Sequence, residues 1–379
     1  MPDARPPRFL PLFLIALAVR ALVVVLGIQL ATLPPHGARP TDPAATAILD
    51  QLLAGAGAIE PWYRWDAVWI VNVATNGYAG ASDSGGRLGV AFLPALPALM
   101  AASAAVGLNM FWMGLIAANV AAAAGVAVFA RVAARLTGNR DVGLRTFALL
   151  LVFPTAFFFS APYNEAFGLL FASLALSAWQ AGRAKTAGVL ALLGSLARMT
   201  GVALGVAAVG SWVFDRRRTR DGAKRAMWLV AGSFGGLVLF WCFLWWAVGD
   251  FFAGAKSQVA WGRAGPAVLN PWHALVEAFD PAMPRYGDVL AVGGCAILGV
   301  RAWVKRGAFW GIVTLIPVLQ MLATGTLLSG TRLVLSCLPA FIELADVLKR
   351  RVWFGAVCVV FAGLQVVLLN DYVHWVFAG

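Results

Sequence analysis

The stretch FLPLFLIALAVRALVVVLGIQLA, residues 9–31, decides the fold class, because its only charged residue is Arg20. A helix needs about 20 apolar residues to cross about 30 Å of hydrocarbon. Similar runs recur along a chain that is 61% hydrophobic and 12% charged, whereas soluble domains carry about 25% charged residues. We therefore predict an all-α, polytopic membrane protein. The first run is too long for a signal-peptide core, so we expect it to remain as a helix.

The net charge of +12 is distributed in a way that predicts orientation rather than nucleic-acid binding. Lys and Arg gather in short segments between apolar runs, most densely at 131–145, 215–225 and 349–351. Because such residues favour cytoplasmic loops, we place these segments and the N-terminus inside. No Walker A or dinucleotide-binding motif is present.

This charge pattern predicts about eleven spans in a single domain, residues 1–379, with two large outer loops. The first loop, 32–108, contains a proline-bearing segment at 90–106 that we interpret as interfacial or re-entrant. The second outer loop is 249–288. The motif LARMTG, residues 196–201, interrupts an apolar run and predicts two short helices, 186–197 and 200–214. Broken helices at membrane depth are tolerated where they line a polar cavity.

Asp66 is the first candidate functional residue, because it lies among Trp62, Trp65 and Trp69 just beyond the first span. On one helix, Trp62, Asp66 and Trp69 would share a face. Tryptophan favours the membrane interface, and acids near spans commonly mark function. Arg64 is a nearby cation for this carboxylate. An interfacial anchor whose acid merely faces water is an equal alternative.

Glu165 follows Tyr163 and Asn164 in a second outer turn, at the depth expected for Asp66. Alternatively, Asn164 could cap a helix whose first turn contains Glu165. Arg198 and Arg332 are cations on the same predicted side. Both could pair with Asp66 or Glu165, and both could bind phosphate through their planar forks of donors.

The remaining polar residues are weaker candidates. Lys256 and His273 lie in the second outer loop and could contact substrate, although solvated loop residues are the more common case. Glu343 and Asp346 are interpreted as ion pairs near the inner face. The four cysteines have neither metal-site nor disulfide spacing and are expected to be small apolar residues.

Five segments, taken in order, resemble the PIG-V family. They are RWDAVWIVNVATNGY (64–78), FLPALPALM (92–100), FPTAFFFSAPYNEAFGLLF (153–171), LARMTG (196–201) and GTRLVLSCLPAFIELA (330–345). PIG-V proteins are endoplasmic-reticulum mannosyltransferases that add the second mannose of GPI anchors, and bacterial homologues share these motifs. The family belongs to the GT-C glycosyltransferases, which are multi-helix membrane enzymes.

The resemblance implies an inverting mannosyltransferase in a bacterial plasma membrane, with its active site facing the periplasm. The donor would be a polyprenyl-phosphate sugar, and the acceptor a glycan, glycolipid or protein. The role of general base falls on Asp66, with Glu165, Arg198 and Arg332 in support. No cofactor is required, although Asp66 and Glu165 could share a divalent cation. Leu333 and Asn164 depart from the family pattern, which has Tyr and Ser or Thr there.

Two other functions fit the same sequence. A lipid-linked sugar flippase would need cation-lined cavities open to both leaflets of the membrane. A non-catalytic partner subunit would make Asp66 dispensable. Under the leading hypothesis, aromatic residues such as Trp65 and Tyr163 would stack on the sugar.

Overall fold

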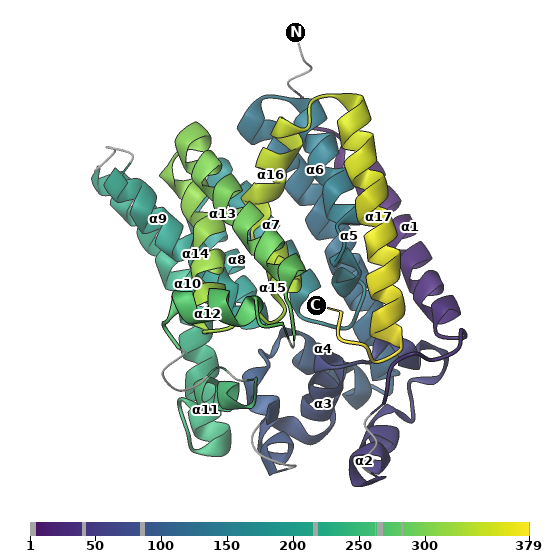
Figure 1. Cartoon of the computed structure of the whole chain (residues 1–379). Helices are drawn as coiled ribbons and strands as arrows, with labels where there is room; N and C mark the ends of the chain where they lie inside the picture. Colours follow the sequence, from purple (N-terminus) through teal and green to yellow (C-terminus); the bar gives the residue numbers. More distant parts are fainter. Residues whose placement is uncertain are drawn as a thin grey trace.

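The computed structural model describes residues 5–39, 43–83, 88–214, 219–261, 263, 268–281 and 283–378. These residues form helices and turns without any strand (Figure 1), so the all-α prediction is confirmed. Part of the predicted basic segment 215–225, namely 215–218, lies outside the described residues.

Five helices in the described residues are long and apolar enough to cross a membrane. They are α1 (Phe9–Leu30), α5 (Met110–Thr137), α10 (Arg220–Val248), α13 (Tyr286–Arg306) and α17 (Arg351–Val373). These helices are compatible with an integral membrane protein. The expected count of about eleven spans is not what the described residues show.

The other apolar runs form shorter helices: α4 (Ala95–Ala105), α6 (Arg140–Val152), α7 (Glu165–Gln180), α8 (Ala184–Ala197), α9 (Val202–Phe214), α14 (Ala308–Ala323) and α16 (Leu338–Val347). The number of spans predicted from hydropathy was too high, because hydropathy alone does not indicate where a helix ends. The apolar run at 144–160 is not one helix: α6 stops at Val152, before Pro154, and a short turn of 3-10 helix, η3 (Ala156–Phe159), follows. Residues before proline disfavour the helical conformation.

The predicted helix break is confirmed. Helix α8 ends at Ala197, Arg198 has extended backbone, and η4 (Met199–Gly201) leads into α9. The segment 90–106 forms α4, which has 11 residues and is too short to span, as expected.

Short elements make up the two predicted outer loops. The first contains α2 (Pro43–Leu53), η1 (Gly57–Trp62), α3 (Asp66–Asp83), η2 (Leu88–Ala91) and α4. The second contains α11 (Ala253–Lys256), η5 (Ser257–Trp261) and α12 (Pro271–Ala278). Figure 1 shows α2, α3, α4 and α11 together at one end of the bundle, which we call the loop end.

The turns at 137–140, 181–184, 306–308 and 348–351 lie at the other end, which we call the basic end. Contacts between distant segments hold it together. Arg145 Nη1 donates to the Leu348 carbonyl over 2.8 Å, and the Arg225 guanidinium lies 5.1 Å from the Trp179 ring. Arg301 and Asp346 form an ion pair at 2.7 Å. The predicted basic segments that the structure describes thus share one end.

Arg20 fixes the interruption between α6 and η3. This buried guanidinium in α1 donates to the carbonyls of Leu151 (2.8 Å) and Ala156 (2.7 Å). Gln365 of α17 donates to the Phe153 carbonyl over 2.7 Å. The carbonyls that α6 leaves without helical partners are therefore satisfied by two other helices.

Glycines allow α8 and α10 to pack with their backbones in contact. A Cβ added at Gly232 would lie 1.8 Å from the Gly188 carbonyl oxygen. We expect Gly232→Ala to lower the free energy of unfolding by about 1–3 kcal/mol, the usual cost of overpacking. Thermal unfolding in detergent measures it. Gly293→Ala in α13 is the control, because nothing lies within 4 Å of an added Cβ there; an equal loss in both variants would contradict the packing argument.

Candidate functional site

A cavity of about 470 Å³ lies between the loop-end elements and the helical bundle. Its lining comes from α3, the turn before α7, the break between α8 and α9, η5, α14 and the C-terminal segment, together with α15 (Gly330–Leu333). Its charged lining residues are Asp66, Glu165, Arg198, Arg263 and Arg332. Charged side chains from five distant segments thus surround one space in a largely apolar protein.

Asp66 is the first residue of α3, and the preceding backbone turns the chain there. Trp65 has a positive φ of 52°, a conformation uncommon for residues other than glycine. The N-terminus of a helix favours a carboxylate. Asp66 Oδ2 lies 2.8 Å from Arg332 Nη1, and its side chain remains 22% exposed. This carboxylate is therefore both paired and accessible from the cavity.

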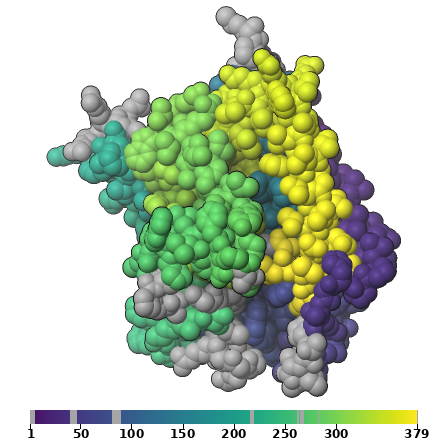
Figure 2. Space-filling view, viewed as in Figure 1, coloured from purple at the N-terminus to yellow at the C-terminus, as the bar shows by residue number. Residues whose placement is uncertain are grey.

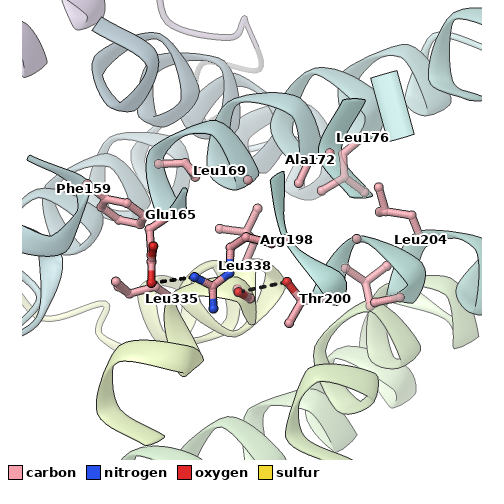
Figure 3. A pocket seen from close by; sticks show the side chains of 16 residues that line it. Phe159, Glu165, Leu169, Ala172, Leu176, Arg198, Thr200, Leu204, Leu335 and Leu338 are labelled. Carbon is pink, nitrogen blue, oxygen red and sulfur yellow. Dashed lines mark hydrogen bonds and ion pairs between the residues drawn. The ribbon is translucent and has the colours of Figure 1, made fainter. Parts of the chain in front are cut away.

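Glu165 is the first residue of α7 and is buried. Its carboxylate pairs with the guanidinium of Arg198, as Figure 3 shows. Arg332 Nε lies 3.3 Å from the same carboxylate oxygen. Arg332 therefore joins Asp66 to Glu165, and the prediction that Arg198 and Arg332 pair with these acids is confirmed.

The charge of Arg332 is stable in this setting. Burial disfavours its charged form, but the carboxylates of Asp66 and Glu165 outweigh burial and raise its pKa above the usual value. The guanidinium also lies over the rings of Phe158 and Tyr163, 5.3 Å and 5.4 Å from their centroids. Its neighbours thus favour the charged form of Arg332.

The helix break positions Arg198 and a glycine makes room for it. Arg198 has extended backbone, with φ −145° and ψ 137°, so its side chain leaves the axis of α8 and reaches Glu165. A Cβ on Gly168 would lie 2.9 Å from Arg198 Cδ. Any larger residue at 168 would push the guanidinium away from its carboxylate.

Aromatic side chains form one wall of the cavity. Trp65, Trp69, Phe158, Tyr163 and Phe377 line it. The Trp65 ring packs against those of Trp375 and Phe377, at 5.8 Å and 5.6 Å between centroids, and its buried Nε1 has no hydrogen-bond partner in the described residues. Stacking surfaces of this kind suit the apolar face of a sugar ring.

Two residues near the cavity have structural roles that the sequence did not suggest. Arg64 turns away and pairs with Glu60 at 2.8 Å, while Tyr163 donates to the Arg64 carbonyl over 2.9 Å. Asn164 lines the cavity but does not cap α7; it accepts from Leu96 N and donates to the Leu93 carbonyl. Asn164 thus ties the turn before α7 to α4.

The structure places two further candidates outside the cavity. Lys256 pairs with Asp250 at 2.8 Å and His273 Nδ1 lies 2.9 Å from the Gly325 carbonyl; neither lines the cavity, and their contact with substrate stays a prediction. Trp62 does not share a helix face with Asp66, because it lies in η1, before α3 begins. Its ring is fully buried, and Nε1 donates to the Val24 carbonyl over 3.1 Å.

Glu343 and Asp346 form ion pairs as predicted, with Arg301 and Arg306 of α13 rather than with residues 349–351. These pairs lie at the basic end, away from the cavity.

Arg263 is the residue that sequence reasoning missed. It comes from the second predicted outer loop and lines the cavity. Arg263 Nη1 donates to Gln258 Oε1 over 3.0 Å, and no carboxylate pairs with it among the described residues. The sequence feature that could have identified Arg263 as a candidate is its position as a cation in a predicted outer loop with few basic residues.

The side chains that line the cavity do not offer the ligands that a divalent cation needs. Both carboxylates are engaged by guanidinium groups, and no group of three potential ligands occurs in the described residues. Mg²⁺ and Ca²⁺ require about six oxygen ligands. Three guanidinium groups against two carboxylates leave one positive charge, which suits an anion instead.

No family model, curated protein or solved structure matches this chain.

Proposed function

We propose that the chain is an inverting glycosyltransferase that transfers mannose from a polyprenyl-phosphate donor to an acceptor hydroxyl on the extracytoplasmic side. The supporting observation is that five segments distant in sequence meet at the same cavity. Each of the five segments that resemble the PIG-V family contributes lining residues to this cavity, among them Asp66, Phe92, Glu165, Arg198 and Arg332. We infer that the chain folds as a GT-C-type membrane bundle in which the shorter helices complete the membrane-embedded core.

An apolar hollow beside the cavity supports a lipid-linked donor. This hollow measures about 400 Å³ and lies between α3, α4, α8 and α10, with Val73, Tyr78, Leu196 and Phe240 among its lining residues. It adjoins the cavity, because Leu93 and Ala197 line the cavity while their neighbours Pro94 and Leu196 line the hollow. A charged space next to an apolar one suits a molecule with a phosphate head and a hydrocarbon tail.

In the proposed reaction the acceptor oxygen attacks the anomeric carbon, while the bond from that carbon to the phosphate oxygen breaks. The acceptor proton passes to the Asp66 carboxylate, and the phosphate leaves with the bonding electron pair. A single displacement inverts the anomeric centre, so a β-linked donor yields an α-linked product. Proton removal by a positioned carboxylate requires an approach of about 3 Å in the productive complex.

An arriving phosphate would compete with Asp66 for Arg332, whose Nη1 lies 2.8 Å from the carboxylate. Sharing the guanidinium with phosphate would free the carboxylate to accept a proton. The positive groups would also stabilise the charge that develops on the leaving phosphate. In this proposal Asp66 stays paired with Arg332 until the donor phosphate binds.

Arg263 is the group best placed to attract the donor, because no carboxylate of the described residues forms an ion pair with it. A phosphodiester carries one negative charge and would balance the single excess positive charge of the cavity. We therefore assign the first contact with the donor phosphate to Arg263, with Arg332 joining it during transfer.

We expect Arg263→Gln to raise the apparent KM for the donor about ten- to a hundredfold, since hydrogen bonds to charged groups contribute about 1.5–3 kcal/mol. The melting temperature should stay near that of the wild type. Steady-state transfer assays over a range of donor concentrations measure the effect. Lys256→Gln is the control, because this exposed residue of the same loop does not line the cavity. An unchanged KM in Arg263→Gln would remove this residue from the donor site.

The direct test uses membranes that contain the protein, incubated with radiolabelled polyprenyl phosphomannose. Label should appear in an acceptor only when the protein is present, and GDP-mannose supplied from outside should not replace the lipid donor. A flippase would move the labelled lipid across the membrane without transferring sugar. That result would overturn the proposed reaction.

A further inference from the structure

A second polar cleft, of about 440 Å³, lies at the basic end between the junction of α5 with α6 and the start of α17. Figure 1 places α6 and the start of α17 at one end of the bundle, whereas α3 and α4 lie at the other end. No residue of this cleft lines the cavity proposed above. The cleft therefore needs an explanation of its own.

The cleft offers positive charge that its own acids do not neutralise. Arg145, Lys349 and Arg351 line it together with Asp141 and Asp346. Asp346 is engaged by Arg301 and Arg306. In contrast, Lys349 and Arg351 are exposed and form no ion pair within the described part of the chain. The cleft is thus suited to an anionic ligand.

Hydrogen bonds from Arg145 fix the wall of the cleft. Arg145 Nη1 donates to the Leu348 carbonyl over 2.8 Å, and Nε donates to the Asp141 carbonyl over 3.3 Å. These bonds fix the turn that carries Lys349 against the first turn of α6. Helix α17 also begins here without a side-chain cap at Arg350, which adds the partial positive charge of a helix N-terminus.

Helix α17 connects this cleft to an apolar surface long enough to cross a membrane. Only four of its 23 residues are buried, and Val352 (79%), Trp353 (62%) and Val359 (74%) are among the most exposed. Figure 2 shows α17 on the surface along its length. Tryptophan at the end of such a helix marks headgroup depth. A ligand in the cleft would therefore have hydrocarbon directly beside it.

We propose that the cleft binds the phosphate headgroup of an anionic phospholipid, whose acyl chains lie along α17. Lys349 and Arg351 contact the phosphate, and Arg145 shapes the wall behind it. Basic residues at a membrane surface each strengthen the binding of anionic lipid about fivefold. This site does not depend on the proposed glycosyl transfer.

The experiment is titration of purified, detergent-solubilised protein with dioleoylphosphatidylglycerol, monitored by thermal unfolding and by lipid retention in native mass spectrometry. Dioleoylphosphatidylcholine and inorganic phosphate are the parallel probes. We expect phosphatidylglycerol alone to raise the melting temperature. The double variant Lys349→Gln/Arg351→Gln should bind it about 25-fold more weakly, from two fivefold effects.

The matched control is Arg220→Gln/Lys224→Gln, which removes the same charge from exposed residues at the start of α10. This variant should bind phosphatidylglycerol as the wild type does. Equal weakening in both double variants would overturn the proposal in favour of general electrostatic attraction. Stabilisation by inorganic phosphate would instead identify a site for a free anion, and unchanged lipid binding in Lys349→Gln/Arg351→Gln would remove the site.

Discussion

Asp66→Asn is expected to reduce sugar transfer from a polyprenyl-phosphate donor by about 10²- to 10⁴-fold, the usual contribution of a general base. Asparagine keeps the size of the side chain but accepts no proton in this role. The fold should be preserved, because Arg332 retains Glu165 as a partner at 3.3 Å and the Asp66 side chain is partly exposed. The measurement is initial transfer rate at saturating donor, together with the melting temperature.

Asp50→Asn provides the control for this loss. Asp50 also pairs with an arginine, Arg39, at 2.6 Å, but both side chains are well exposed. This variant should transfer sugar at the wild-type rate. Turnover retained in Asp66→Asn would eliminate the assignment of the base, whereas a collapse of its melting temperature would identify a purely structural carboxylate.

Glu165→Gln is expected to lower the free energy of unfolding by about 3–5 kcal/mol, because it removes the buried carboxylate of an ion pair and leaves Arg198 without an acidic partner in the described residues, whereas Arg332 keeps Asp66. Glu165 is 4% exposed, and both Arg198 and Arg332 lie against it. Taking one partner out of a buried pair costs more than taking out both. Thermal or denaturant unfolding in a fixed detergent measures the loss.

The double variant Glu165→Gln/Arg198→Gln separates charge from packing. It should recover part of the stability lost in Glu165→Gln, since one unpaired cation has been removed along with the acid. Asp50→Asn is again the comparison, with an expected loss below about 1 kcal/mol for an exposed pair. If Glu165→Gln were no more destabilising than Asp50→Asn, the buried network would not contribute to folding stability.

The principal site residues could be found from sequence because the chain is so apolar. Acids and arginines within such surroundings need partners, so Asp66, Glu165, Arg198 and Arg332 could be expected to meet. Which arginine joins which acid could not be predicted, since Arg332 and Asp66 are 266 residues apart. Nearness in sequence favoured Arg64 instead. That residue is turned away because the positive φ of Trp65 redirects the chain just before α3 begins.

The number of spans was less predictable than the break at Arg198. A break appears in the sequence as a polar residue beside glycine inside an apolar run. In contrast, the end of α6 before Pro154 leaves the hydropathy unchanged on both sides. Arg263 was missed for a related reason, because a loop residue gives no sign of whether it faces a cavity or solvent.

The position of Arg20 has a consequence for biosynthesis. Its carbonyl acceptors, Leu151 and Ala156, are 131 and 136 residues further along the chain, and ribosomes add about 5–20 residues per second. The first helix is therefore synthesised roughly 7–27 s before those acceptors exist. During that interval a charged guanidinium in its middle must be accommodated by water or by the insertion machinery. Helix α1 can therefore form its final hydrogen bonds only after α6 and η3 have been translated.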